Sequence, residues 1–178
     1  LNLLKEDFAS EIILVNDGSY DESLKIATRL SKEQTSIKLI DSKENKGKGH
    51  ALKLGIKEST KKYIGIFDAD LEYYPKDLKK LFQEIDEKKL DLVWGSRFIG
   101  NYKRENKYIR TYFANKLLSL LFSIVHNKKV TDIATCYKLM PSNYFKETKF
   151  NESGFAIEIE MVAKFLKLSR NIIETPIS

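Results

Sequence analysis

The sequence contains very little cysteine and histidine. Its one cysteine, Cys136, excludes an internal disulfide and favours a reducing compartment. Its two histidines, His50 and His126, stand far from that cysteine in the chain, which argues against a zinc site. Neither a disulfide framework nor a zinc centre is therefore expected.

The chain also lacks an apolar run long enough to span a bilayer. The longest such run, residues 117–125, is interrupted by Ser119 and Ser123 and falls well short of the roughly 20 residues that a spanning helix needs. No signal peptide is expected, because residues 1–7 already carry charged side chains. These absences predict a domain that is soluble or lies on a membrane surface.

The composition is typical of one folded domain, which we expect to cover residues 1–178. The chain is 42% hydrophobic and 31% charged, which excludes intrinsic disorder and collagen-like repeats. Lys and Arg total 31 against 25 Asp and Glu, a net charge of +6 that is spread along the chain. This modest excess suits an anionic membrane or a phosphorylated substrate as well as nucleic acid, and a solvated lysine-rich surface is its simplest interpretation.

Short apolar segments alternate with amphipathic ones, which predicts an α/β domain with a largely parallel sheet. In such sheets the loops at the carboxyl ends of the strands form the ligand crevice, and three polar clusters fall at those ends. The expected strands are residues 11–15, 37–40, 63–67, 92–94, 134–140 and 171–174, and the expected helices begin at Ser19 and Pro75 or cover residues 47–58, 109–125 and 157–166.

The helix expected over residues 109–125 is apolar nearly all round in its last turns. The favoured interpretation is a helix buried in the core. The alternative is a helix that rests on a bilayer or a partner, with Lys107, Arg110 and Lys116 at the level of the headgroups.

Two carboxylates directly follow an apolar strand in the sequence Asp68-Ala69-Asp70. They place hard oxygen ligands two residues apart on a turn, as Mg²⁺ or Mn²⁺ shared with phosphate oxygens prefers. Glu72 supplies a third oxygen ligand or a contact to water. The competing interpretation is a solvated acidic turn that precedes the next helix.

Two more clusters suggest contacts to a nucleotide. Asp17 ends the first strand, where its carboxylate either stabilises its own turn or accepts a hydrogen bond from a base N–H or a ribose hydroxyl. Gly47, Lys48 and Gly49 stand at an expected helix N-terminus, which favours anions. Their spacing fits neither a Walker A loop nor a dinucleotide fingerprint, so this turn indicates phosphate without naming the ligand.

Arginines follow the fourth expected strand. Arg97 comes directly after Gly95 and Ser96, and Arg104 and Arg110 stand near the apolar helix. A guanidinium pairs well with phosphate, although most surface arginines bind nothing specific.

Taken in order, these clusters resemble the family-2 glycosyltransferases of the GT-A fold. The resemblance is greatest to the branch that moves a sugar from a nucleotide onto a polyprenyl (dolichyl or bactoprenyl) phosphate. The matching segments are Val15-Asn16-Asp17-Gly18-Ser19 with Asp21, Asn45-x-Gly47-Lys48-Gly49-x-Ala51, Asp68-Ala69-Asp70-Leu71-Glu72, Gly95-Ser96-Arg97-Phe98, Thr135-Cys136-Tyr137-Lys138, Gly154-Phe155 through Glu158-Ile159-Glu160, and Glu174-x-Pro176-Ile177.

The resemblance implies three sets of site residues. The catalytic set has Asp70, the basic positions near the acceptor phosphate and donor diphosphate, and an acidic position before the Thr-Cys-Tyr-Lys stretch. The nucleotide-sugar set includes the base-contacting aspartate and the glycine-rich turn, and the metal set would hold Mg²⁺ or Mn²⁺. The sets are Asp70, Arg97, Arg110 and Asp132 (catalytic), Asp17, Gly18, Ser19, Lys48, Gly49, Asp68 and Ala69 (nucleotide sugar), and Asp68, Asp70 and Glu72 (metal).

The resemblance also implies a Rossmann-like, mostly parallel sheet flanked by helices. The family's opening strand, with its nucleotide-holding end, has no counterpart in the sequence, and neither does the segment that usually follows Pro176. We therefore expect a glycosyltransferase domain that lacks its first strand, as a fragment truncated at both ends would.

The acceptor is predicted from the scarcity of general bases. A sugar hydroxyl needs a base to become nucleophilic, whereas a phosphate acceptor is already anionic. Only Asp132, Glu158 and Glu160 are candidates for a base in the second half. A polyprenyl phosphate acceptor is therefore favoured, with direct displacement and inversion at the sugar carbon, by an enzyme at the cytoplasmic face of a membrane.

Two alternatives remain open. A soluble family member would add a sugar to a hydroxyl of a glycan, lipid or polysaccharide. A non-catalytic α/β module would keep only nucleotide binding. The donor nucleotide sugar, of the GDP-mannose or UDP-glucose type, is not determined by the sequence. Nucleic acid is not an expected partner, because no basic stripe is interleaved with aromatic residues.

Overall fold

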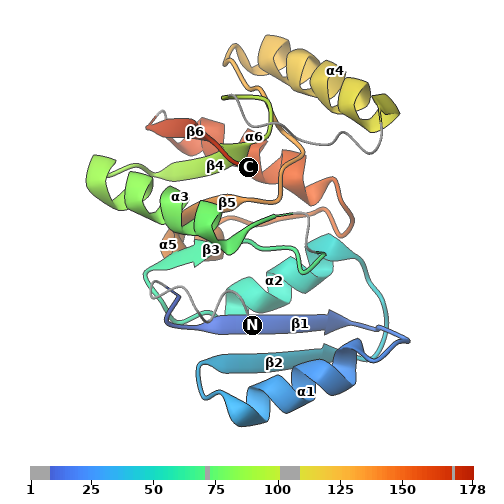
Figure 1. Ribbon diagram of the computed structural model, residues 1–178. Helices are drawn as coiled ribbons and strands as arrows, with labels where there is room; N and C mark the ends of the chain where they lie inside the picture. Colours follow the sequence, from blue (N-terminus) through green and yellow to red (C-terminus); the bar gives the residue numbers. More distant parts are fainter. Residues whose placement is uncertain (1–8, 71–72, 101–108, 170) are drawn as a thin grey trace. The chain divides into compact units, whose positions relative to one another are not determined.

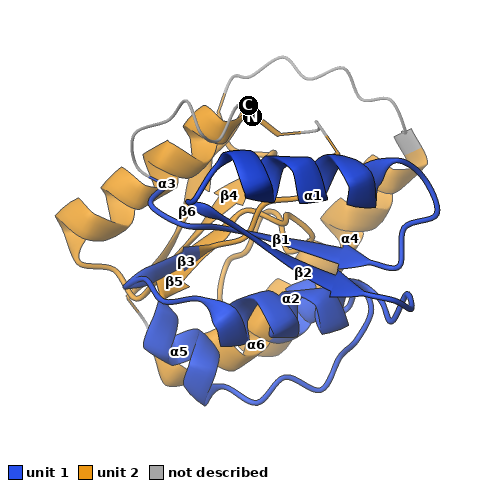
Figure 2. Ribbon diagram, turned by 90° about the horizontal axis from the view of Figure 1, so that it is seen from below, with its two compact units in different colours: residues 1–64, 142–160 blue, residues 65–141, 161–178 orange. Residues whose placement is uncertain are grey.

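The structure is a computed structural model of the chain that describes residues 9–70, 73–100, 109–169 and 171–178. The chain divides into two compact units, shown in blue and orange in Figure 2. Unit 1 contains residues 1–64 and 142–160, and unit 2 contains residues 65–141 and 161–178. The two units are described separately below.

Unit 1 is built on a pair of parallel strands. β1 (Ile12–Asp17) pairs with β2 (Ile37–Ser42), with Val15 opposite Ile40. Helices α1 (Ser23–Glu33) and α2 (Lys48–Glu58) pack against these strands, and a short helix, α5 (Ser142–Glu147), contacts α2. The order strand, helix, strand, helix is the one that the alternating sequence pattern predicts.

The first helix begins later than expected. Its N-cap residue is Glu22, and no side chain caps the helix there. Ser19 instead donates its backbone N–H to the side-chain oxygen of Asn16, while Asp21 accepts the backbone N–H of Ser23. The polar side chains of residues 16–21 therefore shape the turn that follows β1, and α1 starts only after this turn is complete.

Unit 2 contains most of a four-stranded sheet in the order β3-β5-β4-β6. Its strands are β3 (Tyr63–Gly65), β5 (Lys138–Pro141), β4 (Leu92–Ser96) and β6 (Ile172–Pro176). β4 runs parallel to β6 but antiparallel to β5, so the expected parallel order fails at one strand. The cause lies in the preceding segment: Thr131 and Asp132 bind Ser96 and Arg97 at the carboxyl end of β4, so β5 must run back from that end.

The core of unit 2 surrounds β4, in which every residue is buried. Helix α3 (Pro75–Lys88) begins at Pro75, as expected, and buries Leu78, Leu81 and Ile85. Helix α6 (Ile157–Leu168) starts in unit 1 and continues into unit 2, where Met161 and Phe165 are buried. The i, i+3, i+4 spacing of these apolar residues explains why they form helices with one buried face.

Helix α4 (Ile109–His126), drawn in yellow in Figure 1, corrects the favoured expectation that this segment is buried in the core. Only Ser119 and Phe122 are buried among its described side chains. Its large apolar side chains are instead exposed: Phe113, Leu117, Leu120, Leu121, Ile124 and Val125. Over the described residues, no helix is both long and apolar enough to cross a membrane.

Candidate active site

The turn after β1 binds the loop that leads into α2. The carboxylate of Asp17 accepts hydrogen bonds from the backbone N–H of Lys46, at 3.1 and 3.2 Å, and of Gly47, at 2.7 Å. Gly18 has φ +69°, and a Cβ there would lie 2.5 Å from the backbone nitrogen of Asn45. The structure thus gives Asp17 a structural role in joining two loops at the carboxyl edge of the β1–β2 pair.

The glycines of the next loop allow a close approach of two backbones in unit 1. Gly47 has φ +92°, and a Cβ at this position would lie 2.6 Å from the carbonyl oxygen of Ser153. A Cβ at Gly49 would lie 2.5 Å from the carbonyl oxygen of Glu152. The backbone N–H of His50 also donates to the Ser153 carbonyl. The glycines expected at a phosphate-facing turn are therefore required here for backbone packing.

Lys48, which the sequence associates with phosphate, makes a largely buried ion pair. Its Nζ lies 2.8 Å from Oε1 of Glu158, and the two side chains are 14% and 4% exposed. The ring of Phe155 lies 5.8 Å from the same ammonium group. Two residues further on, the carboxylate of Glu160 accepts the backbone N–H groups of Asn151 and Glu152.

The two carboxylates after β3 lie in unit 2 at the edge of the described segment. Asp68 is half-buried, and Ala69 and Asp70 are exposed. Among the described residues, no three His, Cys, Asp or Glu side chains form a group able to hold a metal ion. Glu72, the third expected ligand, lies outside the described residues. Two accessible carboxylates with a small residue between them fit the oxygen donors that Mg²⁺ and Mn²⁺ prefer.

An aromatic pair connects this acidic tip with the arginine that follows β4. The rings of Tyr73 and Tyr137 lie 4.7 Å apart, and the Tyr137 hydroxyl donates to the carbonyl of Tyr74 at 3.0 Å. Burial raises the pKa of Tyr137 above its ordinary value. The guanidinium carbon of Arg97 lies 6.0 Å from the Tyr73 ring. The ring of Phe67, which directly precedes Asp68, lies 5.5 Å from that of Tyr137, so unit 2 brings the start of the acidic tip and the side chain of Arg97 to one aromatic cluster.

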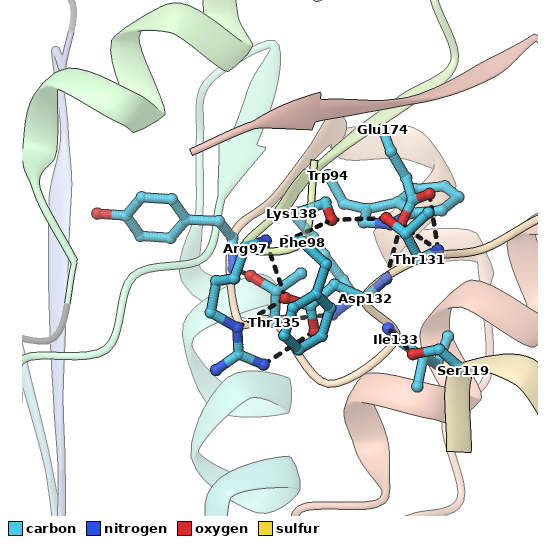
Figure 3. Close-up of polar contacts among 12 residues, drawn as sticks. Trp94, Arg97, Phe98, Ser119, Thr131, Asp132, Ile133, Thr135, Lys138 and Glu174 are labelled. Carbon is cyan, nitrogen blue, oxygen red and sulfur yellow. Dashed lines mark hydrogen bonds and ion pairs between the residues drawn. The ribbon is translucent and has the colours of Figure 1, made fainter. Parts of the chain in front are cut away.

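Arg97 is held by Asp132 through a two-pronged ion pair (Figure 3). Nε donates to Oδ2 at 2.6 Å and Nη2 donates to Oδ1 at 2.8 Å, while the Arg97 backbone N–H donates to Oδ2 at 3.0 Å. The Arg97 side chain is 15% exposed and that of Asp132 is fully buried. Within the described part of the chain, Nη1 of Arg97 makes no hydrogen bond, so it can donate to an anion.

The environment keeps Arg97 charged and Tyr73 neutral. Burial by itself would lower the pKa of Arg97, but the hydrogen bonds and negative charge of Asp132 raise it above its usual range. Burial also raises the pKa of Tyr73, although the positive charge of Arg97 acts in the opposite direction. Arg97 is therefore a fixed cation at any pH at which the protein is folded.

A second carboxylate, Glu174 on β6, binds the backbone of the segment that carries Asp132. Its oxygens accept the backbone N–H of Thr131, at 2.8 and 2.9 Å, and of Asp132, at 3.0 Å. Oε1 also accepts the indole N–H of Trp94 at 2.8 Å. Glu174 thus fixes the segment that carries Asp132, and Asp132 in turn fixes Arg97. All of these contacts lie within unit 2 and are drawn in Figure 3.

The structure brings together only some of the predicted site residues. Arg97 and Asp132 are directly bonded. Arg110 is exposed in the first turn of α4, and it makes no hydrogen bond or ion pair within the described residues. The predicted nucleotide-binding residues Asp17, Gly18, Ser19, Lys48 and Gly49 all belong to unit 1, whereas those of the Asp68–Asp70 tip belong to unit 2.

Sequence reasoning missed the supporting roles of Glu174, Tyr73 and Tyr137. The sequence indicates Glu174 only as part of a closing motif. Its position opposite Trp94 depends on the register of β4 and β6, which are far apart in the sequence. A glutamate facing the middle of a fully buried strand would have been a signal only once that pairing was known.

The comparison with protein families gives one match. Residues 2–149 match the model of the family described as "Glycosyl transferase family 2". The matched range includes the turns after β1 and β3, the glycine-rich loop, and the Arg97–Asp132 pair.

The curated proteins that are similar to this chain include one that matches all of it and one that matches about half of it. An uncharacterized protein of Methanocaldococcus jannaschii is 28% identical over 190 residues, which is 100% of this chain and 81% of that protein. A dolichyl-phosphate beta-glucosyltransferase of Dictyostelium discoideum is 39% identical over 95 residues, which is 51% of this chain and 29% of that protein.

Among solved structures, the chain is similar to glucosyl-3-phosphoglycerate synthase from Mycobacterium tuberculosis, in a complex with Mn²⁺, uridine-diphosphate-glucose and phosphoglyceric acid. The TM-score is 0.71 at 14% identity, over 92% of this chain and 57% of that one. The chain thus spans a little over half the length of that enzyme. At this level of identity the likeness shows a shared α/β fold.

Proposed function

Since the chain belongs to glycosyl transferase family 2 and has its GT-A fold, we propose that it transfers a sugar from a nucleotide-sugar donor to a polyprenyl phosphate, with inversion at the sugar carbon. The acceptor class is supported by the similarity to a dolichyl-phosphate glucosyltransferase over half of the chain. We also propose that residues 1–178 act as one glycosyltransferase domain, because the family match extends over both compact units.

One observation carries the choice of acceptor: each carboxylate that the sequence offers as a general base is already engaged in a structural contact. Asp132 is fully buried against Arg97. Glu158 is buried against Lys48. Glu160 accepts two backbone N–H groups. A hydroxyl acceptor would need one of them to remove a proton, whereas a phosphate acceptor is already a nucleophilic anion and needs no base.

In this proposal the residues of the chain neutralise and position negative charge. Arg97 is a permanent cation whose orientation is fixed by Asp132 and Glu174, so its remaining N–H groups can donate to a phosphate oxygen without reorganising. Charge that is fixed before the reaction stabilises the leaving diphosphate more than a mobile lysine would. Arg110 is the second proposed basic residue, at the start of α4.

The proposed metal site uses Asp68 and Asp70, with Glu72 as a further ligand outside the described residues. A bound Mg²⁺ or Mn²⁺ would neutralise the charge that develops on the diphosphate as the sugar leaves. In the proposed nucleotide site, Asp17 contacts the base, and Gly18, Ser19, Lys48, Gly49 and Ala69 line the donor. Lys48 and Asp17 already have partners in the structure, so donor binding would rearrange these contacts.

The test is a transfer assay with the protein and a panel of radiolabelled nucleotide sugars, including GDP-mannose and UDP-glucose, with a polyprenyl phosphate as acceptor. We expect one donor to give label that is extracted into organic solvent and released by mild acid, as a glycosyl phosphate is. Asp70→Asn should abolish this product. Label that enters the lipid fraction but resists mild acid would indicate a hydroxyl acceptor and overturn the proposal.

A polyprenyl phosphate is confined to a bilayer, so the proposed reaction requires the protein to work at a membrane surface. We therefore propose a peripheral location at the cytoplasmic face of a membrane, where nucleotide sugars are available. Sedimentation of the protein with the membrane fraction, and its release by high salt, would support this location.

A further inference from the structure

Helix α4 presents an apolar stripe that nothing in the described structure covers. Phe113 is 64% exposed, Leu117 58%, Leu121 51% and Ile124 69%. These positions follow the spacing i, i+4, i+8, i+11, which places them on one face of the helix. A stripe of this kind on the surface of a protein marks a binding surface for an apolar environment.

The orientation of α4 is specific, because two of its serines face inward. Ser119 is buried, and its hydroxyl accepts the backbone N–H of Ile133 at 3.1 Å. The hydroxyl of Ser123 accepts the backbone N–H of Val130 at 2.9 Å. A helix that hid its apolar face would turn these serines outward. In the structure, these serines instead bind the segment beyond the helix, and Leu117, Leu120 and Leu121 are exposed.

The charges around the stripe have one sign. From Ile109 to Thr131 the sequence contains no Asp or Glu, whereas Arg110, Lys116, Lys128 and Lys129 all lie in this stretch. Lys116 is exposed beside the stripe, with its ammonium 4.8 Å from the centre of the Tyr112 ring. An aromatic and basic border around an apolar face is typical of helices that lie in the interface of an anionic bilayer.

We propose that the exposed face of α4 docks the protein onto an anionic lipid bilayer, with the apolar stripe among the acyl chains and Lys116 and Arg110 at the phosphate level. The inference deepens the proposed function, and it rests on that function only for the reason why docking would be useful. The charge pattern favours a bilayer over a second copy of the chain, since a symmetric dimer through α4 would bring like charges together.

Docking through α4 would place the Arg97–Asp132 pair at a fixed position relative to the lipid headgroups. The helix is bonded through Ser119 and Ser123 to residues 130–133, the segment that includes Asp132. The ring of Phe98, next to Arg97, lies 5.3 Å from that of Tyr112 on the helix. The surface that would enter the bilayer and the cation that would meet a lipid phosphate are therefore joined by direct contacts within unit 2.

The experiment is flotation of the protein with vesicles of phosphatidylcholine containing phosphatidylglycerol, without nucleotide sugar or polyprenyl phosphate. We expect the wild-type protein to float with these vesicles and to be released by salt. A triple variant, Leu117→Gln with Leu121→Gln and Ile124→Gln, should lose at least about tenfold in the partition coefficient, because binding scales with the buried apolar area. Lys116→Ala should lose about fivefold.

The matched control is the double variant Ile26→Gln with Leu168→Gln, which removes exposed apolar side chains from α1 and α6. It should bind vesicles like the wild type, and circular dichroism should show that all variants are folded. Failure of the wild type to bind vesicles, or equal binding by the triple variant, would overturn the proposal. Concentration-dependent dimerisation that the triple variant abolishes would instead assign the face to a second copy.

The outcome is separable from that of the proposed function. The transfer assay can be run in detergent micelles, in which docking to a bilayer is not required. If the triple variant lost vesicle binding but kept normal transfer in micelles, the docking role of α4 would be confirmed. Transfer that is absent in micelles, together with α4-dependent vesicle binding, would overturn the proposed reaction and leave the docking surface standing.

Discussion

Asp132 binds the side chain of Arg97 at two points, with Nε to Oδ2 at 2.6 Å and Nη2 to Oδ1 at 2.8 Å. The two residues are 35 positions apart, and the carboxylate is completely buried. This geometry fixes the direction in which the guanidinium can bind a further anion, and it engages both oxygens of Asp132. The first prediction tests that relationship.

Asp132→Asn should destabilise the protein by about 3–5 kcal/mol, because it leaves a largely buried guanidinium without its counter-charge. Urea unfolding measures this loss. The control is Asp86→Asn, since Asp86 forms an exposed ion pair with Lys89 and its removal should cost less than about 1 kcal/mol.

The pH profile separates positioning of Arg97 from general base catalysis by Asp132. In the proposed reaction, the residual activity of Asp132→Asn should keep the pH dependence of the wild type, because the carboxylate removes no proton. Loss of the acidic limb of the profile in the variant would contradict this and identify Asp132 as a base.

Glu174→Gln should loosen the segment that carries Asp132. The amide group would place N–H donors against the N–H groups of Thr131 and Asp132, at a cost of about 1–3 kcal/mol for each buried donor left unpaired. Trp94 is the only tryptophan and donates to Glu174, so its fluorescence reports the change directly. An unaltered emission spectrum and unfolding midpoint would be inconsistent with this role. Glu87→Gln, at an exposed position of α3, is the matched control.

Replacement by alanine should have opposite effects on stability at two glycines of α2. A Cβ at Gly49 would lie 2.5 Å from the backbone carbonyl oxygen of Glu152. Because these two backbone segments cannot move apart without disturbing the loop, Gly49→Ala should lower the free energy of unfolding by about 1–3 kcal/mol. At Gly55 the nearest atom would be a methyl group of Val15 at 3.4 Å, so Gly55→Ala should stabilise the helix by up to about 1 kcal/mol. Thermal denaturation of both variants tests the pair, and equal effects would disprove the packing argument.

Metal binding should depend on the acidic tip after β3. Mn²⁺ together with a nucleoside diphosphate should raise the melting temperature, with a stabilisation of about 2.7 kcal/mol at a hundred times the Kd. Asp70→Asn and Asp68→Asn should each abolish the metal-dependent part of the shift, and EDTA should reverse it in the wild type. A shift that persists in both variants would place the metal elsewhere.

Alkaline pH should destabilise the protein through Tyr73 and Tyr137. Burial raises the pKa of both phenols above their ordinary value of 10.0, so the folded state holds these protons more tightly than the unfolded state. Their contribution to stability is complete below pH 10 and is lost as the pH rises above it. Urea unfolding between pH 8 and pH 11 measures the loss. Tyr73→Phe should reduce the loss, whereas Tyr20→Phe, at a fully exposed position, should leave it unchanged.

Much of the fold could be predicted from local patterns. The strand that ends at Asp17 and the helix that begins at Pro75 follow from apolar periodicity and from the fixed backbone angle of proline. The acidic pair Asp68 and Asp70 also follows β3 as expected, although β3 ends at Gly65 rather than at residue 67. These features depend on residues close together in the sequence, so the sequence contains the information that decides them.

The antiparallel direction of β5 could not be predicted in this way. The sequence predicts a strand over residues 134–140, whereas β5 covers only Lys138–Pro141. Its partner and direction are set by Thr131 and Asp132, which bind the carboxyl end of β4. The burial of α4 was predicted wrongly for a similar reason. An apolar helix was assumed to bury its leucines, whereas Ser119 and Ser123 bind backbone groups beyond the helix and turn the apolar face outward.

The sequence by itself determined the family, the order of the helices and strands apart from the short helix α5, and the residue types available for charge neutralisation, because these depend on short motifs and on local periodicity. The tertiary structure decided which charges act together. The side chain of Arg97 binds the carboxylate of Asp132, and Glu174 accepts the backbone N–H of Asp132, only because β4, β6 and the segment after α4 converge. Buried charges must find a partner wherever the fold places one.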